Sequence, residues 1–163
     1  MAKADRFEDL IIWQQARKLT KGVYDITKSG DFRYDSRFVQ QIRAAAGSVM
    51  DNIAEGFERD GNKEFIQFLY VAKGSCGEVR SQLYRAFDAN FINEETFTKM
   101  MNECLSINKG ILNFIKTLKS SPITGTKYMP SETLWTPLKP LKPTETLLNP
   151  LKPLKLQSLK LTI

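Results

Sequence analysis

The stretch Gln41-Ile42-Arg43-Ala44-Ala45-Ala46 continues, five residues later, into Asn52-Ile53-Ala54-Glu55-Gly56. A second pair of segments, Phe65-Ile66-Gln67-Phe68-Leu69 and Ala72-Lys73-Gly74-Ser75, follows the same pattern. Apolar residues recur at helical spacing in both stretches. Small and polar residues stand where an ordinary amphipathic helix would not carry them. Both stretches are therefore predicted to be helices packed on more than one side, in a bundle that associates with copies of itself.

Apolar steps of three and four residues extend this pattern over residues 1–120. The first predicted helix runs from about Phe7 to Lys28, and Asp5 with Glu8 forms a capping-box-like start. The second predicted helix starts near Asp35 or Ser36, and a glycine-containing segment ends it.

Two further helices complete the predicted bundle. After a break at residues 59–61, the third helix opens at Asn62 as its N-cap and carries an apolar stripe to Ala86. The fourth opens at Asn93 and ends before Pro122. Four helices joined by short loops predict an all-α, antiparallel up-down-up-down four-helix bundle. No stretch alternates with a period of two residues, so no sheet is expected.

The composition divides the chain into two predicted parts. Residues 1–120 hold 18 Lys and Arg against 16 Asp and Glu, whereas residues 121–163 hold six Lys against two Glu. The second part also repeats Pro-Leu-Lys-Pro-Leu-Lys at 137–142 and 150–155. Repeated proline forbids a continuous helix and favours extended chain. We expect a bundle domain over 1–120 and a disordered Pro/Leu/Lys-rich tail over 121–163, with docking on a groove or an anionic surface as the alternative.

The composition also argues against several function classes. The chain contains no apolar run of about 18 residues, the length that a membrane span needs. The N-terminal residues also lack the apolar region of a signal peptide. A cytoplasmic protein is therefore expected. The sequence contains no histidine, the commonest general base and metal ligand. Cys76 and Cys104 fall at apolar helix positions and are expected in the core, because a zinc site needs four ligands. We expect no enzymatic activity, no cofactor and no metal.

A basic and aromatic stripe is predicted on the first helix, opposite its apolar positions. Successive helical residues turn by about 100°, so six side chains share this side: Arg6, Trp13, Arg17, Lys21, Tyr24 and Lys28. With Arg43 of the second helix they are candidates for a nucleic-acid site, in which cations bind phosphates and rings stack on bases. The alternative is a subunit interface anchored by Trp13 and Tyr24, with the charges at its rim.

Polar residues line up beside the apolar stripe of the second helix: Gln41, Ser48, Asn52 and Glu55. Buried polar groups need hydrogen-bond partners. We therefore expect a structural network that fixes helix register within or between subunits. A catalytic or ligand-binding site is the alternative.

Small residues form a face of the third helix directed away from its core stripe: Gly74, Gly77 and Ser81. Glycine inside a helix costs roughly 0.5–1 kcal/mol relative to alanine. Two glycines in one helix therefore indicate that a neighbouring helix or subunit packs closely there, and a local bend is the alternative.

The order and spacing of these motifs resemble a known family. Over about residues 5–119 the chain is similar to the four-helix-bundle proteins encoded in the intervening sequences of bacterial 23S ribosomal RNA genes. Accessory proteins of diversity-generating retroelements are similar to that family. The resemblance rests on Phe7-x-x-Leu10-x-x-Trp13-Gln14, Gln41-Ile42-Arg43-Ala44-Ala45, Ser48, Asn52-Ile53-Ala54-Glu55-Gly56, Phe65-Ile66-x-Phe68-Leu69 and Ala72-x-Gly74-Ser75-x-x-Glu78.

The resemblance implies an antiparallel protomer in a homopentameric, barrel-like assembly, and it supplies no catalytic residue. For the retroelement members it implies a positively charged surface that binds nucleic acid and a reverse transcriptase. Gly56, Ser75, Gly77 and Glu78 are expected at helix or subunit contacts. The expected function is therefore a non-enzymatic homo-oligomer that binds RNA through a basic surface. The alternative is a scaffold that docks a partner such as a reverse transcriptase.

Overall fold

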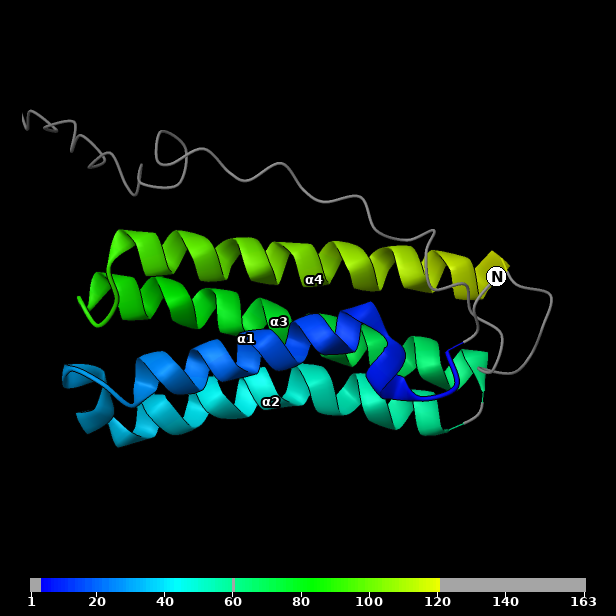
Figure 1. The fold of residues 1–163 in the computed structure, drawn as a ribbon, viewed down its shortest axis with the longest axis horizontal. Helices are drawn as coiled ribbons and strands as arrows, with labels where there is room; N and C mark the ends of the chain where they lie inside the picture. The colour runs from blue at the N-terminus through cyan, green and yellow to red at the C-terminus, as the bar shows by residue number, and fades with distance from the viewer. Residues whose placement is uncertain (1–3, 60, 121–163) are drawn as a thin grey trace, which may run out of the picture.

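A computed structural model describes residues 4–59 and 61–120 of the chain (Figure 1). Four α-helices, α1 (Ile11–Thr27), α2 (Ser36–Glu58), α3 (Asn62–Asp88) and α4 (Glu94–Ser120), are joined by short connections. Two 3-10 turns, η1 (Phe7–Asp9) and η2 (Asp31–Tyr34), precede α1 and α2. Successive helices run in opposite directions (Figure 1), and the described ranges contain no strand. The predicted antiparallel four-helix bundle is confirmed.

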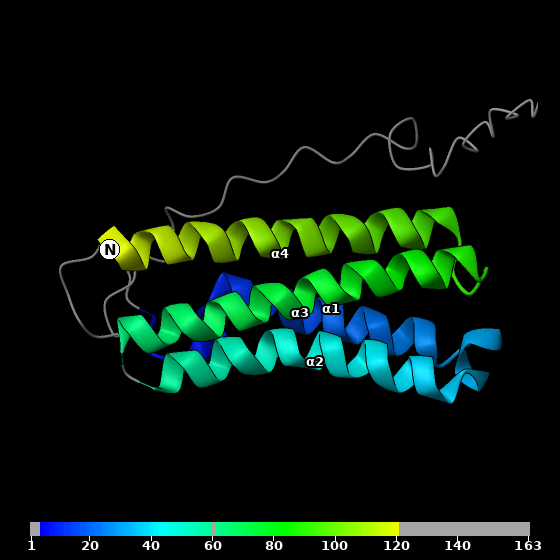
Figure 2. The same cartoon turned by 180° about the vertical axis from the view of Figure 1, so that it is seen from behind.

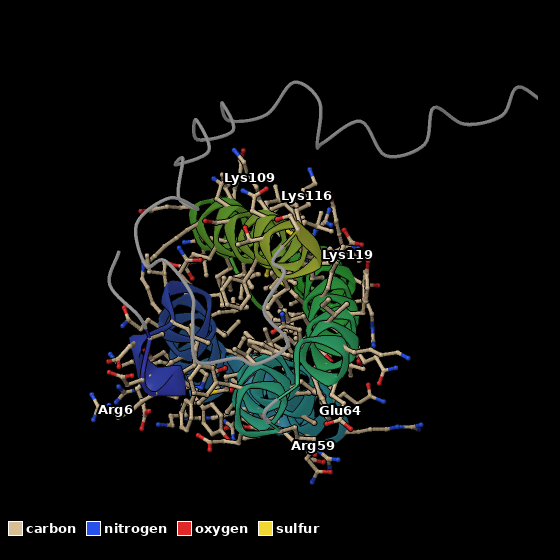
Figure 3. The ribbon with its side chains drawn as sticks, turned by 90° about the vertical axis from the view of Figure 1, so that its right-hand side faces the viewer. Arg6, Arg59, Glu64, Lys109, Lys116 and Lys119 are labelled. Atoms are coloured by element: carbon tan, nitrogen blue, oxygen red, sulfur yellow. The ribbon has the colours of Figure 1, made fainter. Side chains whose placement is uncertain are left out.

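The apolar stripes of all four helices meet in one continuous core. Leu19 of α1, Ile53 of α2, Leu69 of α3 and Ile111 of α4 are each completely buried in it. α1 and α3 lie on opposite sides of the bundle, and each packs against both α2 and α4 (Figures 1 and 2). The end-on view shows the four helices closing a ring around this core (Figure 3). The spacing of apolar residues by three and four fixes this arrangement, because it places one stripe on each helix.

The first helix is interrupted near its start. Leu10 has extended backbone angles (φ −74°, ψ 122°) and separates the 3-10 turn η1 from α1. Its side chain is buried, so the break anchors the N-terminal segment to the core. The prediction of one helix from Phe7 to Lys28 with a side-chain cap is wrong, because no side-chain cap begins η1 or α1. A buried leucine, rather than a cap, determines where α1 begins.

Two of the predicted helix starts carry side-chain caps in the structure. The Asp35 carboxylate accepts a hydrogen bond of 3.0 Å from the Phe38 backbone N–H, and Asn93 Oδ1 accepts one of 2.9 Å from the Thr96 N–H. Both bonds satisfy N–H groups that the first turn of a helix leaves unpaired. The prediction of Asn62 as the N-cap of α3 is wrong, since Gly61 takes that position and Asn62 is the first helical residue.

An unpredicted aromatic cluster closes one end of the bundle. The connection between α1 and α2 folds into η2, which buries Phe32 completely. The Phe32 ring stacks on Phe91 with centroids 4.8 Å apart and tilts against Phe38 at 4.9 Å. Asn90, with a φ of 56°, turns the chain after α3 so that Phe91 reaches this cluster.

Two predicted features lie outside the described residues. These are Asp60, in the break between α2 and α3, and the tail over residues 121–163 with its Pro-Leu-Lys repeats. Within the described ranges, no helix has the length and hydropathy that a membrane span requires.

Candidate nucleic-acid interface

Tyr24 lies between two cations on the edge where α1 meets α2. The guanidinium carbon of Arg43 is 4.6 Å from the centre of the Tyr24 ring, and Lys28 Nζ is 5.9 Å from it. The Tyr24 side chain remains 41% exposed. The fold therefore brings together three of the predicted binding residues, two from α1 and one from α2, as a ring flanked by positive charges.

Arg43 is held in place by a buried hydroxyl. Its Nε donates a hydrogen bond of 2.8 Å to Thr27 Oγ1. The Thr27 hydroxyl in turn donates to the Val23 carbonyl at 2.7 Å, and the residue is almost completely buried. Arg43 is thus oriented before any ligand binds, which lowers the entropy cost of using it in recognition.

Trp13 does not lie on the solvent side of α1, contrary to the prediction. It is buried, and its ring packs edge-on against Phe7 with centroids 5.1 Å apart. The break at Leu10 folds the N-terminal segment back over this side of α1 and so covers the indole. Trp13 therefore anchors the N-terminal turn and is unavailable for stacking on a base.

The other predicted cations of this stripe have different surroundings. Arg6 forms an ion pair of 3.3 Å with Asp9 within the N-terminal turn. Arg17 is exposed, with its guanidinium carbon 5.9 Å from the Trp13 ring. Lys21 is exposed on α1 and lines a cavity on the side of α4. The predicted stripe is therefore not one continuous surface, because Tyr24 and Lys28 lie towards α2 whereas Lys21 lies towards α4.

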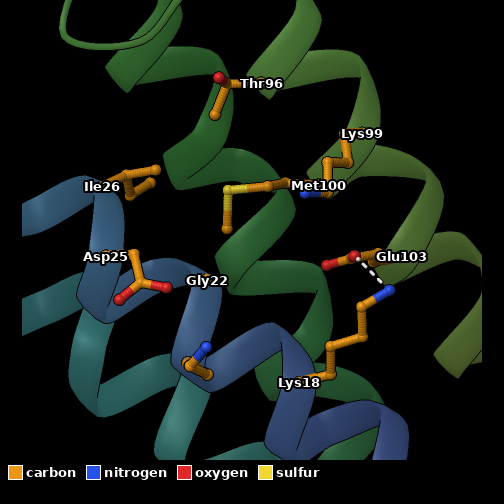
Figure 4. Close-up of a pocket in the computed structure, with 9 residues that line it drawn as sticks. Lys18, Gly22, Asp25, Ile26, Thr96, Lys99, Met100 and Glu103 are labelled. Atoms are coloured by element: carbon orange, nitrogen blue, oxygen red, sulfur yellow. Dashed lines mark ion pairs between the residues drawn. The ribbon is translucent and has the colours of Figure 1, made fainter.

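This cavity, of about 320 Å³, lies between α1 and α4. Lys18 Nζ and Glu103 Oε1 form an ion pair of 3.0 Å across it (Figure 4). Side chains of both charge signs surround an apolar floor, and the lining residues are Lys18, Lys21, Gly22, Asp25, Ile26, Thr96, Lys99, Met100 and Glu103. No feature of the sequence indicated this opening, because it results from the spacing of two helices distant in the chain.

Two of the four predicted polar residues of α2 form a hydrogen-bond network with α3. Ser48 Oγ and Ser75 Oγ lie 2.9 Å apart, and Asn52 Nδ2 donates to both the Ser48 carbonyl, at 2.7 Å, and its hydroxyl, at 3.0 Å. Ser75 Oγ also donates to the Val71 carbonyl at 3.2 Å. All three side chains are half-buried. The arrangement links α2 to α3 within one protomer.

The remaining polar candidates lie outside this network. Gln41 is exposed. Glu55 pairs with Arg59 at 2.7 Å on the surface of α2. Glu78 accepts a hydrogen bond of 3.1 Å from Gln82 one turn later on α3. Gln41 and Glu55 therefore do not join the network within the protomer, because both side chains are exposed. Their role in a network between subunits stays a prediction.

The close helix contacts are made by glycines other than the two singled out on α3. A β-carbon added to Gly56 would lie 2.6 Å from the Phe68 Cβ, and one added to Gly110 would lie 2.9 Å from Ile12 Cγ2. Around Gly74 and Gly77 nothing lies within 4 Å of such an atom. No helix of the same protomer packs on those two glycines, and the alternative that a neighbouring subunit packs there stays a prediction. The role of Gly110 was missed, although it too is a glycine within a helical pattern.

A second cationic surface was also missed. It lies along α3 and α4 and is called the α3/α4 face below. Its residues are Tyr70, Lys73 and Arg80 of α3 and Lys109, Lys116 and Lys119 of α4. One signal in the sequence could have indicated it, since residues 104–120 contain three lysines and no acidic residue.

Among the described residues, no group of three or more Cys, Asp and Glu side chains is placed to hold a metal ion. Cys76 and Cys104 are free thiols buried between α3 and α4, where Cys76 Sγ lies 3.4 Å from the Cys104 carbonyl. The expected core role of both cysteines is confirmed.

The fold defines an all-helical protein with the up-down topology of an antiparallel four-helix bundle and with cationic edges. A protein-family model described as 23S rRNA-intervening sequence protein matches residues 8–113. The chain belongs to this family, as the sequence motifs predicted.

A solved structure shows the same fold. It is the 1.70 Å crystal structure of a protein with unknown function, from the S23 ribosomal protein family, of Bacteroides thetaiotaomicron. The two share 19% sequence identity with a TM-score of 0.60, over 65% of this chain and 99% of that one. No curated protein matches the chain in sequence.

Proposed function

We propose that this protein is a non-enzymatic homo-oligomer that binds RNA through its basic surface. The observation that carries the proposal is the cluster of Arg43 and Lys28 on the exposed Tyr24 ring. Within the described residues neither cation has a carboxylate partner. Unpaired cations contribute to affinity by releasing counterions from phosphates, and an exposed ring offers a surface for a base.

The same proposal includes assembly into a homopentamer, as the family resemblance implies. Gly74 and Gly77 lie on a face of α3 that also exposes Val71, with 52% of its surface accessible. Glycine lowers the stability of a helix relative to alanine. At these two positions no contact within the protomer offsets that loss. A second copy packed on this face would provide the compensation. Assembly would also multiply the few cations of one protomer through avidity.

The test is fluorescence anisotropy of a labelled, structured RNA titrated with the full chain at about 50 and about 200 mM salt. Phosphate contacts should make the affinity fall steeply over this range. The expected result is tight binding at low salt with a strong salt dependence. Absence of binding at low salt would exclude the proposal. A matched titration with the Arg43→Gln variant measures how much of the RNA affinity comes from the Tyr24 cluster.

A second candidate function is a scaffold that docks a partner protein such as a reverse transcriptase. The exposure of Tyr70 and Val71 on one helix favours it, because apolar and aromatic side chains are typical of protein interfaces. The genomic neighbourhood separates the candidates. A gene inside a ribosomal RNA operon favours the RNA-binding protein, and a neighbouring reverse transcriptase gene with a repeat cassette favours the scaffold.

A further inference from the structure

The C-terminal half of α4 carries positive charge alone. Residues 104–120 contain Lys109, Lys116 and Lys119 and no Asp or Glu. Lys109 and Lys116 are seven residues apart, so they share one side of the helix and are separated by about 10 Å along its axis. Figure 3 shows both side chains directed away from the bundle. They are therefore placed to contact successive phosphates of an extended strand.

α3 adds two cations on the side that borders α4. Lys73 precedes Cys76 by three residues and Arg80 follows it by four, so both share the side of α3 that carries Cys76. That side borders α4, because Cys76 Sγ lies 3.4 Å from the Cys104 carbonyl oxygen. Lys73 and Arg80 are half-buried at this border. This border between α3 and α4, called the seam below, therefore carries Lys73 and Arg80 next to the helix that carries the three lysines.

An aromatic ring lies at the end of the same seam. Lys119 Nζ is 3.3 Å from the Tyr70 hydroxyl and 5.7 Å from the centre of the Tyr70 ring. The Tyr70 side chain is 47% exposed. An exposed ring held beside a lysine can stack on a base, and only an unpaired base presents its face.

The cations of the α3/α4 face form no ion pair with a carboxylate of the described residues. Within residues 4–59 and 61–120 the ion pairs are Arg6–Asp9, Lys18–Glu103 and Arg59–Glu55, and no cation of the α3/α4 face takes part in them. Residues 1–103 hold 15 Lys and Arg against 16 Asp and Glu, whereas residues 104–163 hold nine Lys against two Glu. The excess positive charge of the whole protein therefore begins in α4.

The edge at Tyr24 differs in this respect. Asp25 is exposed three residues before Lys28 and opposes its charge. Arg43 is already engaged by the Thr27 hydroxyl and the Tyr24 ring. Less free charge is available to a phosphate there than on the α3/α4 face.

We propose that the α3/α4 face is the principal phosphate-binding surface of the protein and that it takes a single-stranded segment of RNA, one base of which stacks on Tyr70. This inference rests on the proposed RNA binding and specifies where and which form of RNA is bound. Lys73, Arg80, Lys109, Lys116 and Lys119 contact the backbone, and the ring selects unpaired bases.

Two full-chain variants, each of which loses three positive charges, test the location. The first is K109Q/K116Q/K119Q on α4, and the matched control is R17Q/K21Q/K28Q on α1. Binding of a single-stranded RNA is titrated at several salt concentrations. The α4 variant should reduce the slope of log affinity against log salt by about 2, since each phosphate contact contributes roughly 0.7 for a single strand. The α1 control should change it by less than half as much.

The form of RNA is tested with Tyr70→Ala and Tyr70→Phe on single-stranded and duplex RNA of the same sequence. Tyr70→Ala should weaken single-strand binding roughly tenfold and leave duplex binding unchanged, because stacking is lost. Tyr70→Phe, which keeps the ring, should retain most of the affinity. Equal loss on both RNA forms would overturn the single-strand assignment.

Other outcomes separate the two proposals. A larger loss in the α1 variant, or equal losses in both, would overturn the α3/α4 face and leave RNA binding intact. The same conclusion would follow if replacing the six lysines of residues 121–163 with glutamine abolished binding and the α4 variant did not affect it. Failure of the unaltered protein to bind either RNA at low salt would overturn the proposed function itself.

Discussion

Gly56 of α2 and Phe68 of α3 approach so closely that a β-carbon on residue 56 would lie 2.6 Å from the Phe68 Cβ. The Phe65 ring lies at 2.7 Å from the same point. The glycine that ends the Asn-Ile-Ala-Glu-Gly motif is therefore required by packing, because any side chain there would have to push α3 away. This contact occurs near the connection between α2 and α3, where the two helices converge.

We expect Gly56→Ala to destabilise the protein relative to Gly77→Ala. Both substitutions gain helix propensity of about 0.5–1 kcal/mol, but only residue 56 lacks space for the methyl group. The free energy of unfolding, measured by urea denaturation, should differ between the variants by about 1–3 kcal/mol, the usual cost of overpacking a core. Equal values for the two variants would contradict the close approach.

The hydroxyls of Ser48 and Ser75, 2.9 Å apart, should be energetically coupled. Ser48→Ala and Ser75→Ala are each expected to cost about 1 kcal/mol of unfolding free energy, because each leaves a half-buried partner with fewer hydrogen bonds. The double variant should cost less than the sum by about 0.5–1.5 kcal/mol. Urea denaturation of the four proteins completes the cycle, and strictly additive losses would show that the two hydroxyls do not interact.

Gly74→Leu should separate assembly from protomer stability. The position is open within the protomer, so leucine should not lower the stability of the bundle and should add about 0.5–1 kcal/mol of helix propensity. If α3 packs on a second copy at this face, the side chain blocks the contact and the assembly dissociates. Light scattering coupled to size exclusion measures the mass of the particle.

The control for this experiment is Ser106→Leu on α4, which adds a similar side chain to a partly exposed position of another helix. The control should keep the mass of the unaltered protein. A Gly74→Leu protein of unaltered mass would refute packing on the α3 glycines.

Cys104 should make stability fall in alkaline solution. Its hydrogen bond with Cys76 and its burial raise the pKa of the Cys104 thiol above the ordinary value. The folded state then keeps a proton that the unfolded chain releases near a pKa of about 8.5. Because the folded state binds more protons, this contribution to stability is complete below that pH and decreases as the pH rises above it.

The measurement is the free energy of unfolding between pH 7 and pH 10 for the unaltered protein and for Cys104→Ala. The variant is expected to be less stable at pH 7 and to lose less stability as the pH rises. Both thiols should also resist a thiol reagent until urea unfolds the chain, since both are buried. Rapid labelling in the folded state would contradict the core position of the pair.

Much of the fold was predictable because it depends on local spacing. Apolar steps of three and four residues located all four helices, and the short polar side chains of Asp35 and Asn93 marked two helix starts that the structure confirms. The family could be predicted from ordered motifs and is confirmed by the match over residues 8–113. Within the site, the helical repeat placed Tyr24 and Lys28 on one side of α1.

Other features depend on which segments become neighbours. Trp13 was predicted to be exposed from the helical repeat of α1 alone. That repeat does not reveal that the segment before Leu10 packs over the indole of Trp13. Phe32 and Phe91 are distant in sequence, and only the closed bundle stacks their rings.

The sequence by itself thus determined the four helices, their order and the side of each helix that is buried, since these follow from periodicity within one segment. The tertiary structure decided that Gly56 rather than Gly74 makes the close contact, and that Lys73 and Arg80 lie on the side of α3 that borders α4. The physical reason is that steric exclusion and the summation of charge act between atoms close in space. The relevant distances are set only once the helices have packed.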